Sequence, residues 1–181
     1  MGFKSYAEMV DYNIEHDSTE VFGNFSTEHA SHIVTRFLEN AKKTIIVLSG
    51  SFVDVTPTQG MCALLRQTAL RLKENNGSIR IITADGNKNS DIEKICSEIK
   101  NKDSFDYIPA KYAGHIPLKH FMVVDEKMYR LENAHEKNIA EGADVHAEVC
   151  CNGKEKAAQL IEFFDHVWNI LDHSRSKQQE V

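Results

Sequence analysis

Residues 118–125 read LKHFMVVD: four apolar residues, preceded by a lysine and a histidine and followed by an aspartate. A run of this length and type predicts a buried strand. Because side chains alternate across a strand, His120 is expected on the same face as Leu118 and Met122. Lys119 is expected on the opposite face. His120 is therefore either an ordinary, partly buried histidine or part of a functional site.

The segments around this strand alternate between helix and strand patterns. One helix is expected to begin at Ser26 or Thr27, and three more are expected within residues 57–74, 90–100 and 154–174. The expected strands are TIIVLS, IRIITAD, FDYIPA, KMYRLE and VHAEVCC. A tight turn at Asp125 to Lys127 joins the quoted strand to the next one. The order predicts an α/β fold, with a mixed β-sheet covered by helices on both faces.

The length of 181 residues and the hydrophobic share of 41% predict one domain with a single substantial core. We expect residues 26–173 to form this domain. Residues 1–25 are expected to be an N-terminal arm or a short helix, and residues 174–181 a frayed tail.

The formal net charge is −6, so a broad basic face for duplex nucleic acid is not expected, and any phosphate must be bound locally. The start of the chain lacks the pattern of a signal peptide, and no run of about 18 apolar residues is present. We therefore expect a cytoplasmic protein that does not enter the membrane. The four cysteines form no CxxC pair, and neither a metal nor another cofactor is expected.

The segment HFMVVDEKMYRLE resembles the signature strand pair of the phospholipase D superfamily, whose motif is His-x-Lys, four mostly apolar residues and Asp. AKKTIIVLSGSF resembles the first core strand of that family, and NNGSIRIITAD resembles its central helix, turn and strand. DVHAEVCCNGKEKAAQLIEFFDHVW resembles its last strand and closing helix. The resemblance covers about residues 26–170 and implies the α-β-α sandwich of the family.

In active members of that family one histidine attacks phosphorus and a second histidine protonates the leaving group. A chain with a single motif meets this requirement by pairing with a second copy, so the resemblance implies a homodimer. Counting back from Asp125, Leu118 occupies the position of the family's histidine, and His120 occupies that of its lysine. The motif is degenerate, because leucine cannot attack phosphorus.

The resemblance also indicates which side chains would line such a site. His120 is the candidate nucleophile, His135 stands where the family often has asparagine, and Glu148 is the candidate for the acid that orients the nucleophile. His146 precedes Glu148 by two residues and shares its face of the strand. The further candidates for ligand binding are Lys119, His115 and His146.

Three functions follow from these residues. The first is a homodimeric, phospholipase D-like domain that binds a phosphate-bearing ligand, such as a nucleotide or nucleic acid, or a protein partner, without phosphodiester turnover. The second is an active nuclease or phosphodiesterase in which His120 attacks with help from His135 and Glu148. The third is a dimeric scaffold. Replacement of the motif histidine by Leu118 favours the first over the second.

Overall fold

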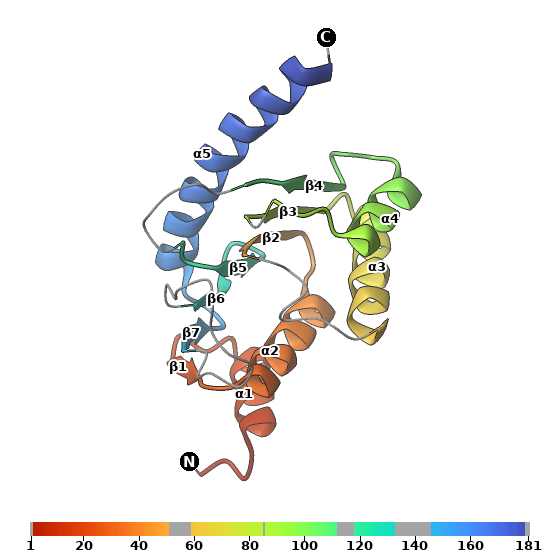
Figure 1. Ribbon diagram of the computed structural model, residues 1–181. Helices are drawn as coiled ribbons and strands as arrows, with labels where there is room; N and C mark the ends of the chain where they lie inside the picture. Colours follow the sequence, from red (N-terminus) through yellow and green to blue (C-terminus); the bar gives the residue numbers. More distant parts are fainter. Residues whose placement is uncertain (1, 51–58, 85, 112–117, 133–145, 180–181) are drawn as a thin grey trace.

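The computed structural model describes residues 2–50, 59–84, 86–111, 118–132 and 146–179 (Figure 1). Within them the chain forms one seven-stranded sheet, with the strand order β1-β7-β6-β5-β2-β3-β4. The strands are β1 (Val21–Asn24), β2 (Thr44–Ser49), β3 (Ser78–Thr83), β4 (Phe105–Pro109), β5 (Phe121–Val124), β6 (Met128–Glu132) and β7 (Ala147–Cys150).

The sheet is mixed in direction. β2, β3 and β4 are parallel neighbours, whereas β5, β6, β7 and β1 continue the sheet from β2 in antiparallel pairs. The carboxyl ends of the three parallel strands therefore lie beside the start of β5 and the ends of β6 and β1. We call this the carboxyl end of the sheet.

Helices cover both faces of the sheet, which confirms the predicted fold class (Figure 1). They are α1 (Tyr6–Glu15), α2 (Thr27–Asn40), α3 (Gln59–Glu74), α4 (Ser90–Ile99) and α5 (Lys154–Gln179). Side chains of α1 to α4 are buried against one face, and those of α5 against the other. The result is a three-layer α-β-α sandwich.

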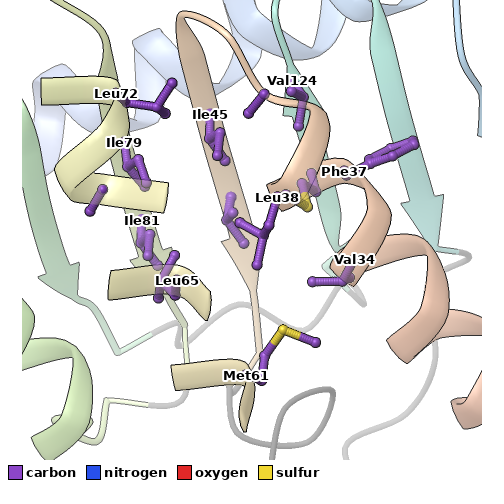
Figure 2. Packing of buried hydrophobic residues seen from close by; sticks show 14 of the residues in the cluster. Val34, Phe37, Leu38, Ile45, Met61, Leu65, Leu72, Ile79, Ile81 and Val124 are labelled. Atoms are coloured by element: carbon purple, nitrogen blue, oxygen red, sulfur yellow. The ribbon is translucent and has the colours of Figure 1, made fainter. Parts of the chain in front are cut away.

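The first face carries the larger core. Phe37 and Leu38 of α2 pack with Ile45 of β2, and Leu65 and Leu72 of α3 complete the layer (Figure 2). All five side chains are at most 2% exposed. Burying a side chain of this size stabilises the fold by about 1.5–3 kcal/mol, so this layer holds the parallel strands in place.

Among the described residues, α5 is the helix that covers the second face. Phe164 and Trp168 of this helix are buried in a cluster with Ile46, Leu48 and Phe121 of the sheet. Arg80 of β3 lies over both rings, 5.2 Å from the centroid of Phe164. The guanidinium therefore contacts aromatic faces on one side and pairs with Asp165, at 2.7 Å, at the margin of this cluster.

Both ends of the chain take part in the fold; a short helix was among the expectations for residues 1–25, whereas a strand there was not. Residues 6–15 are helical, Val10 is fully buried in the core, and residues 21–24 add β1 to the sheet, where no strand was expected. At the other end, α5 continues to Gln179 instead of fraying from residue 174. The expected cap of α2 is present, since the Ser26 hydroxyl accepts a hydrogen bond from the His29 N–H at 3.1 Å.

Among the described residues, no helix is both long and apolar enough to cross a membrane.

Candidate functional site

Polar side chains gather at the carboxyl end of the sheet, on the face covered by α1 to α4. Ser49 ends β2, Glu132 ends β6 and Asn24 ends β1, and all three are buried. His120 precedes β5, where its carbonyl accepts a hydrogen bond from the Glu132 N–H at 2.8 Å. The apolar residues on the same face of these strands belong to the larger core, so the polar side chains lie at one end of that core.

A chain of contacts links four of these side chains. His120 Nδ1 lies 3.7 Å from Glu132 Oε1, and the other Glu132 oxygen accepts a hydrogen bond from Arg130 Nη1 at 2.9 Å. Arg130 Nε in turn donates to Asn24 Oδ1 at 2.9 Å. The His120 side chain is 19% exposed and that of Glu132 only 7%. We call His120, Glu132, Arg130 and Asn24 the histidine cluster.

Glu132 is the negative charge of this cluster. Burial alone would raise its pKa, but the contact with His120 and the charge and hydrogen bond of Arg130 outweigh burial and lower the pKa from 4.5 to about 2. The carboxylate is therefore ionised at neutral pH. It lies beside Nδ1 of the His120 ring and so restricts the orientation of the imidazole.

Gly50 lies against the other side of the imidazole. A Cβ built on Gly50 would stand 2.9 Å from His120 Cε1 and 3.0 Å from Nε2. These distances are shorter than van der Waals contact, so only glycine lets the backbone approach the ring this closely. The imidazole is thus held between a carboxylate at Nδ1 and a bare backbone at the Cε1–Nε2 edge.

The prediction that Leu118 shares a face with His120 is wrong. Leu118 packs against the cluster under α5, which contains Phe121 and Leu131, on the opposite side of the sheet from the histidine cluster. The reason is that β5 begins only at Phe121, so the alternation of a strand does not extend back to Leu118. Lys119, between them, is exposed to solvent.

Glu148 and His146 are not brought to His120 either. Glu148 lies on the α5 face of β7, where its carboxylate accepts a hydrogen bond from the Tyr129 hydroxyl. His146 is exposed and its ring meets Phe25 edge-on, with 5.6 Å between centroids. The carboxylate beside His120 is Glu132, not Glu148.

His115 and His135 fall in residues 112–117 and 133–145, which lie outside the described residues. Their expected roles stay predictions. Among the described residues, no group of three or more His, Cys, Asp or Glu side chains is arranged to hold a metal ion.

Asp125, the last residue of the motif, lies at the amino end of the sheet, away from the histidine cluster. Its carboxylate accepts hydrogen bonds from the backbone N–H groups of Lys42, Lys43 and Thr44 at 2.8, 2.7 and 3.0 Å. Asp125 and Glu126 both have positive φ, as the predicted tight turn requires. The aspartate therefore ties the β5–β6 turn to the start of β2.

Sequence reasoning missed Glu132, Arg130, Asn24 and Gly50. One signal was present: in MYRLE two charged residues stand two positions apart in an otherwise apolar strand, so both point to the same face. A buried pair of opposite charges in such a strand indicates a polar cluster. Nothing in the sequence marked Gly50 as the neighbour of His120.

Neither a scan of family models nor a search of curated proteins gave a match to the chain. Solved structures do match. The phospholipase D family member Nuc from Salmonella typhimurium aligns with a TM-score of 0.53 and 17% identity, over 83% of this chain and 94% of its own. The fold is phospholipase D-like.

Two further solved structures align with most of this chain. NucT from Helicobacter pylori aligns with a TM-score of 0.54 and 12% identity, over 83% of this chain and 97% of its own. TrmBL2, an archaeal chromatin protein described with a novel mode of DNA binding, aligns with a TM-score of 0.57 and 11% identity. That alignment covers 90% of this chain, which spans 58% of the TrmBL2 chain. At these identities the likeness concerns the fold alone.

Proposed function

We propose that this phospholipase D-like domain binds a phosphate-bearing ligand, a nucleotide or a nucleic-acid phosphodiester, at His120, without the two-histidine turnover of the family. The observation that carries the proposal is the placement of His120 at the carboxyl end of the sheet, partly exposed and held by buried Glu132. Ligands of open α/β sheets bind at this end of the strands.

The charges of the cluster suit a phosphate. Arg130 and Glu132 form a buried ion pair, so their charges offset one another and neither is left alone in the core. An imidazolium at His120 would then add one positive charge at the partly exposed end of the cluster. Because the chain as a whole carries −6, such a local cation is what an anionic ligand requires.

The position of Leu118 supports binding without turnover. The family's nucleophile would stand at this position, and here an aliphatic side chain packs under α5 on the other side of the sheet. We further propose that the protein is a cytoplasmic homodimer, in which the clusters of two copies face one ligand across a two-fold axis.

Thermal shift assays test the proposal. Inorganic phosphate, a nucleoside monophosphate and a short single-stranded DNA should each raise the unfolding temperature of the wild type, because a ligand that binds the native state stabilises it. The shift should vanish in His120→Ala and persist in His146→Ala, which removes an exposed histidine outside the histidine cluster. Absence of any shift with all three ligands would leave the dimeric scaffold as the better account.

A second candidate function is phosphodiester cleavage by His120, and one observation favours it. Glu132 stands at Nδ1, the arrangement in which a carboxylate orients an imidazole so that Nε2 attacks. Attack would form a phosphorus–nitrogen bond, and the leaving oxygen would need a proton from the His120 of a second copy. The test is release of p-nitrophenolate from bis(p-nitrophenyl) phosphate and cleavage of single-stranded DNA and RNA, each lost in His120→Ala.

A further inference from the structure

β4 is an edge strand of the described sheet, and a hollow of about 860 Å³ runs along its outer side. The walls are α4 on one face of the sheet and the last turns of α5 on the other. Figure 1 shows these last turns extending past β4. A strand added to β4 would therefore continue the sheet between two helices and be covered on both faces.

The backbone of β4 can be accounted for group by group. Ile79 N–H donates to Ser104 O at 2.9 Å and Ala110 N–H to Thr83 O at 2.7 Å, and the register between them is parallel. In such a ladder alternate residues face the neighbour. Phe105, Tyr107 and Pro109 therefore direct their backbone groups outward, into the hollow.

The outward N–H groups are engaged or absent. Phe105 N–H donates to Asn101 O at 2.9 Å, Tyr107 N–H donates to the Asp106 carboxylate at 2.8 Å, and Pro109 has none. The outward acceptors are the carbonyls of Phe105, Tyr107 and Pro109; within the described residues, Arg175 Nη1 makes a long contact of 3.4 Å with Tyr107 O. This edge is rich in acceptors, so it suits a partner strand that supplies N–H donors.

The charges along the hollow indicate which charge that partner should carry. Lys88, Lys100 and Lys102 line the hollow, and Lys88 lies 3.5 Å from the carboxylate of Glu93, which lines it as well. Arg175 of α5 also lines the hollow; it donates to both oxygens of Asp106, at 2.9 and 2.7 Å, and its Nε donates to Asp172 at 3.1 Å. The four cationic side chains of the lining outnumber its two carboxylates, Glu93 and Asp106, although the chain as a whole carries −6, and this excess favours an anionic partner.

We propose that the outer side of β4 is a docking site for an extended acidic peptide segment, which pairs with β4 and places a carboxylate on Arg175 in place of Asp106. In the unbound protein, Asp106 occupies the position on the Arg175 guanidinium that the partner's carboxylate takes on binding. A second copy of β4 fits less well, because it would bring like-charged lysines together and offers no N–H at Pro109.

The probe is a fluorescent seven-residue peptide of alternating valine and aspartate, titrated with the full chain and followed by fluorescence polarisation. We expect saturable binding that weakens with salt. A peptide with lysine in place of aspartate should not bind, and neither should the acidic peptide with alternate amides N-methylated, because it lacks the donors.

Two variants of one ion pair separate docking from stability. Arg175→Gln should weaken binding about tenfold, because it removes the receptor for the carboxylate. Asp106→Asn should instead tighten binding several-fold, because it removes the charge of the carboxylate that occupies two donors of Arg175 and leaves Asp172 as the remaining internal partner. A purely structural pair would shift both in the same direction. Arg80→Gln is the matched control: its partner Asp165, at 2.7 Å, also joins the sheet to α5, but away from the hollow, so affinity should not change.

Three results would overturn the proposal: equal binding of the acidic and the lysine peptides, weakening of binding by both variants of the ion pair, or binding of the N-methylated peptide. Self-association of the wild type that the acidic peptide competes away would show that the occupant is a second copy instead.

Discussion

Replacing Asp125 with alanine is expected to lower the free energy of unfolding by about 3–4 kcal/mol. The carboxylate accepts three backbone hydrogen bonds, from Lys42, Lys43 and Thr44, at 2.7–3.0 Å. A hydrogen bond to a charged group contributes about 1.5–3 kcal/mol, but this turn is partly exposed and water replaces part of each bond. Alanine also fits the positive φ of 51° at this position less well than aspartate does.

Two further variants divide this loss. Asp125→Asn keeps one acceptor oxygen and tolerates positive φ, so it should cost about 1–2 kcal/mol. Glu126→Ala has a similar backbone, with a φ of 58°, but its carboxylate does not hold the start of β2. It should therefore change the free energy of unfolding by less than about 0.5 kcal/mol, because glutamate and alanine carry the same Cβ at positive φ.

The assay is equilibrium urea unfolding at pH 7, followed by the fluorescence of the single tryptophan, Trp168. If Asp125→Ala costs no more than Glu126→Ala, the carboxylate does not clamp β2 and the reasoning is refuted. Because Asp125 lies at the amino end of the sheet, none of these variants should change ligand affinity at His120 while the protein stays folded.

Three other predictions concern the histidine cluster and assembly. Glu132→Gln should lower the free energy of unfolding by about 3 kcal/mol at pH 7, which is the equivalent of lowering the Glu132 pKa from 4.5 to about 2. The wild type has this advantage only while the carboxylate is ionised. Urea unfolding should therefore show the difference between the two proteins shrinking as the pH falls from about 4.5 towards 2. Gly50→Ala should change the free energy of unfolding by less than about 1 kcal/mol, because the partly exposed His120 ring can move aside. The displaced ring should nevertheless lower ligand affinity about tenfold in a calorimetric titration. Light scattering at micromolar concentration should report a dimer, and a monomer that still binds phosphate would remove the two-fold site from the account.

The fold was predictable because its elements follow simple patterns. The buried strands β2 and β3 are continuous apolar runs, and α2 carries its buried side chains at helical spacing behind a serine cap. β1 was missed because VFGN is short, contains glycine and takes its place in the sheet by pairing with β7. That pairing joins residues more than a hundred positions apart, which no local pattern reveals.

The site was only partly predictable. His120 could be chosen from its place at the entrance of an apolar strand, and the structure places it at the carboxyl end of the sheet. Its partner could not be chosen, because the face of Glu148 is decided by the register between β6 and β7. In that register Glu148 points towards α5. The carboxylate next to His120 is instead that of Glu132, at the end of the adjacent strand β6.

The most direct test of the account is a titration of the protein with a single-stranded DNA trinucleotide, followed by the ¹⁵N resonances of the histidine side chains. We expect the imidazole signals of His120 to shift in a saturable way, those of His146 to stay in place, and binding to be lost in His120→Ala. Saturable binding of the trinucleotide with the His120 signals unmoved, or with full affinity in His120→Ala, would contradict the central claim.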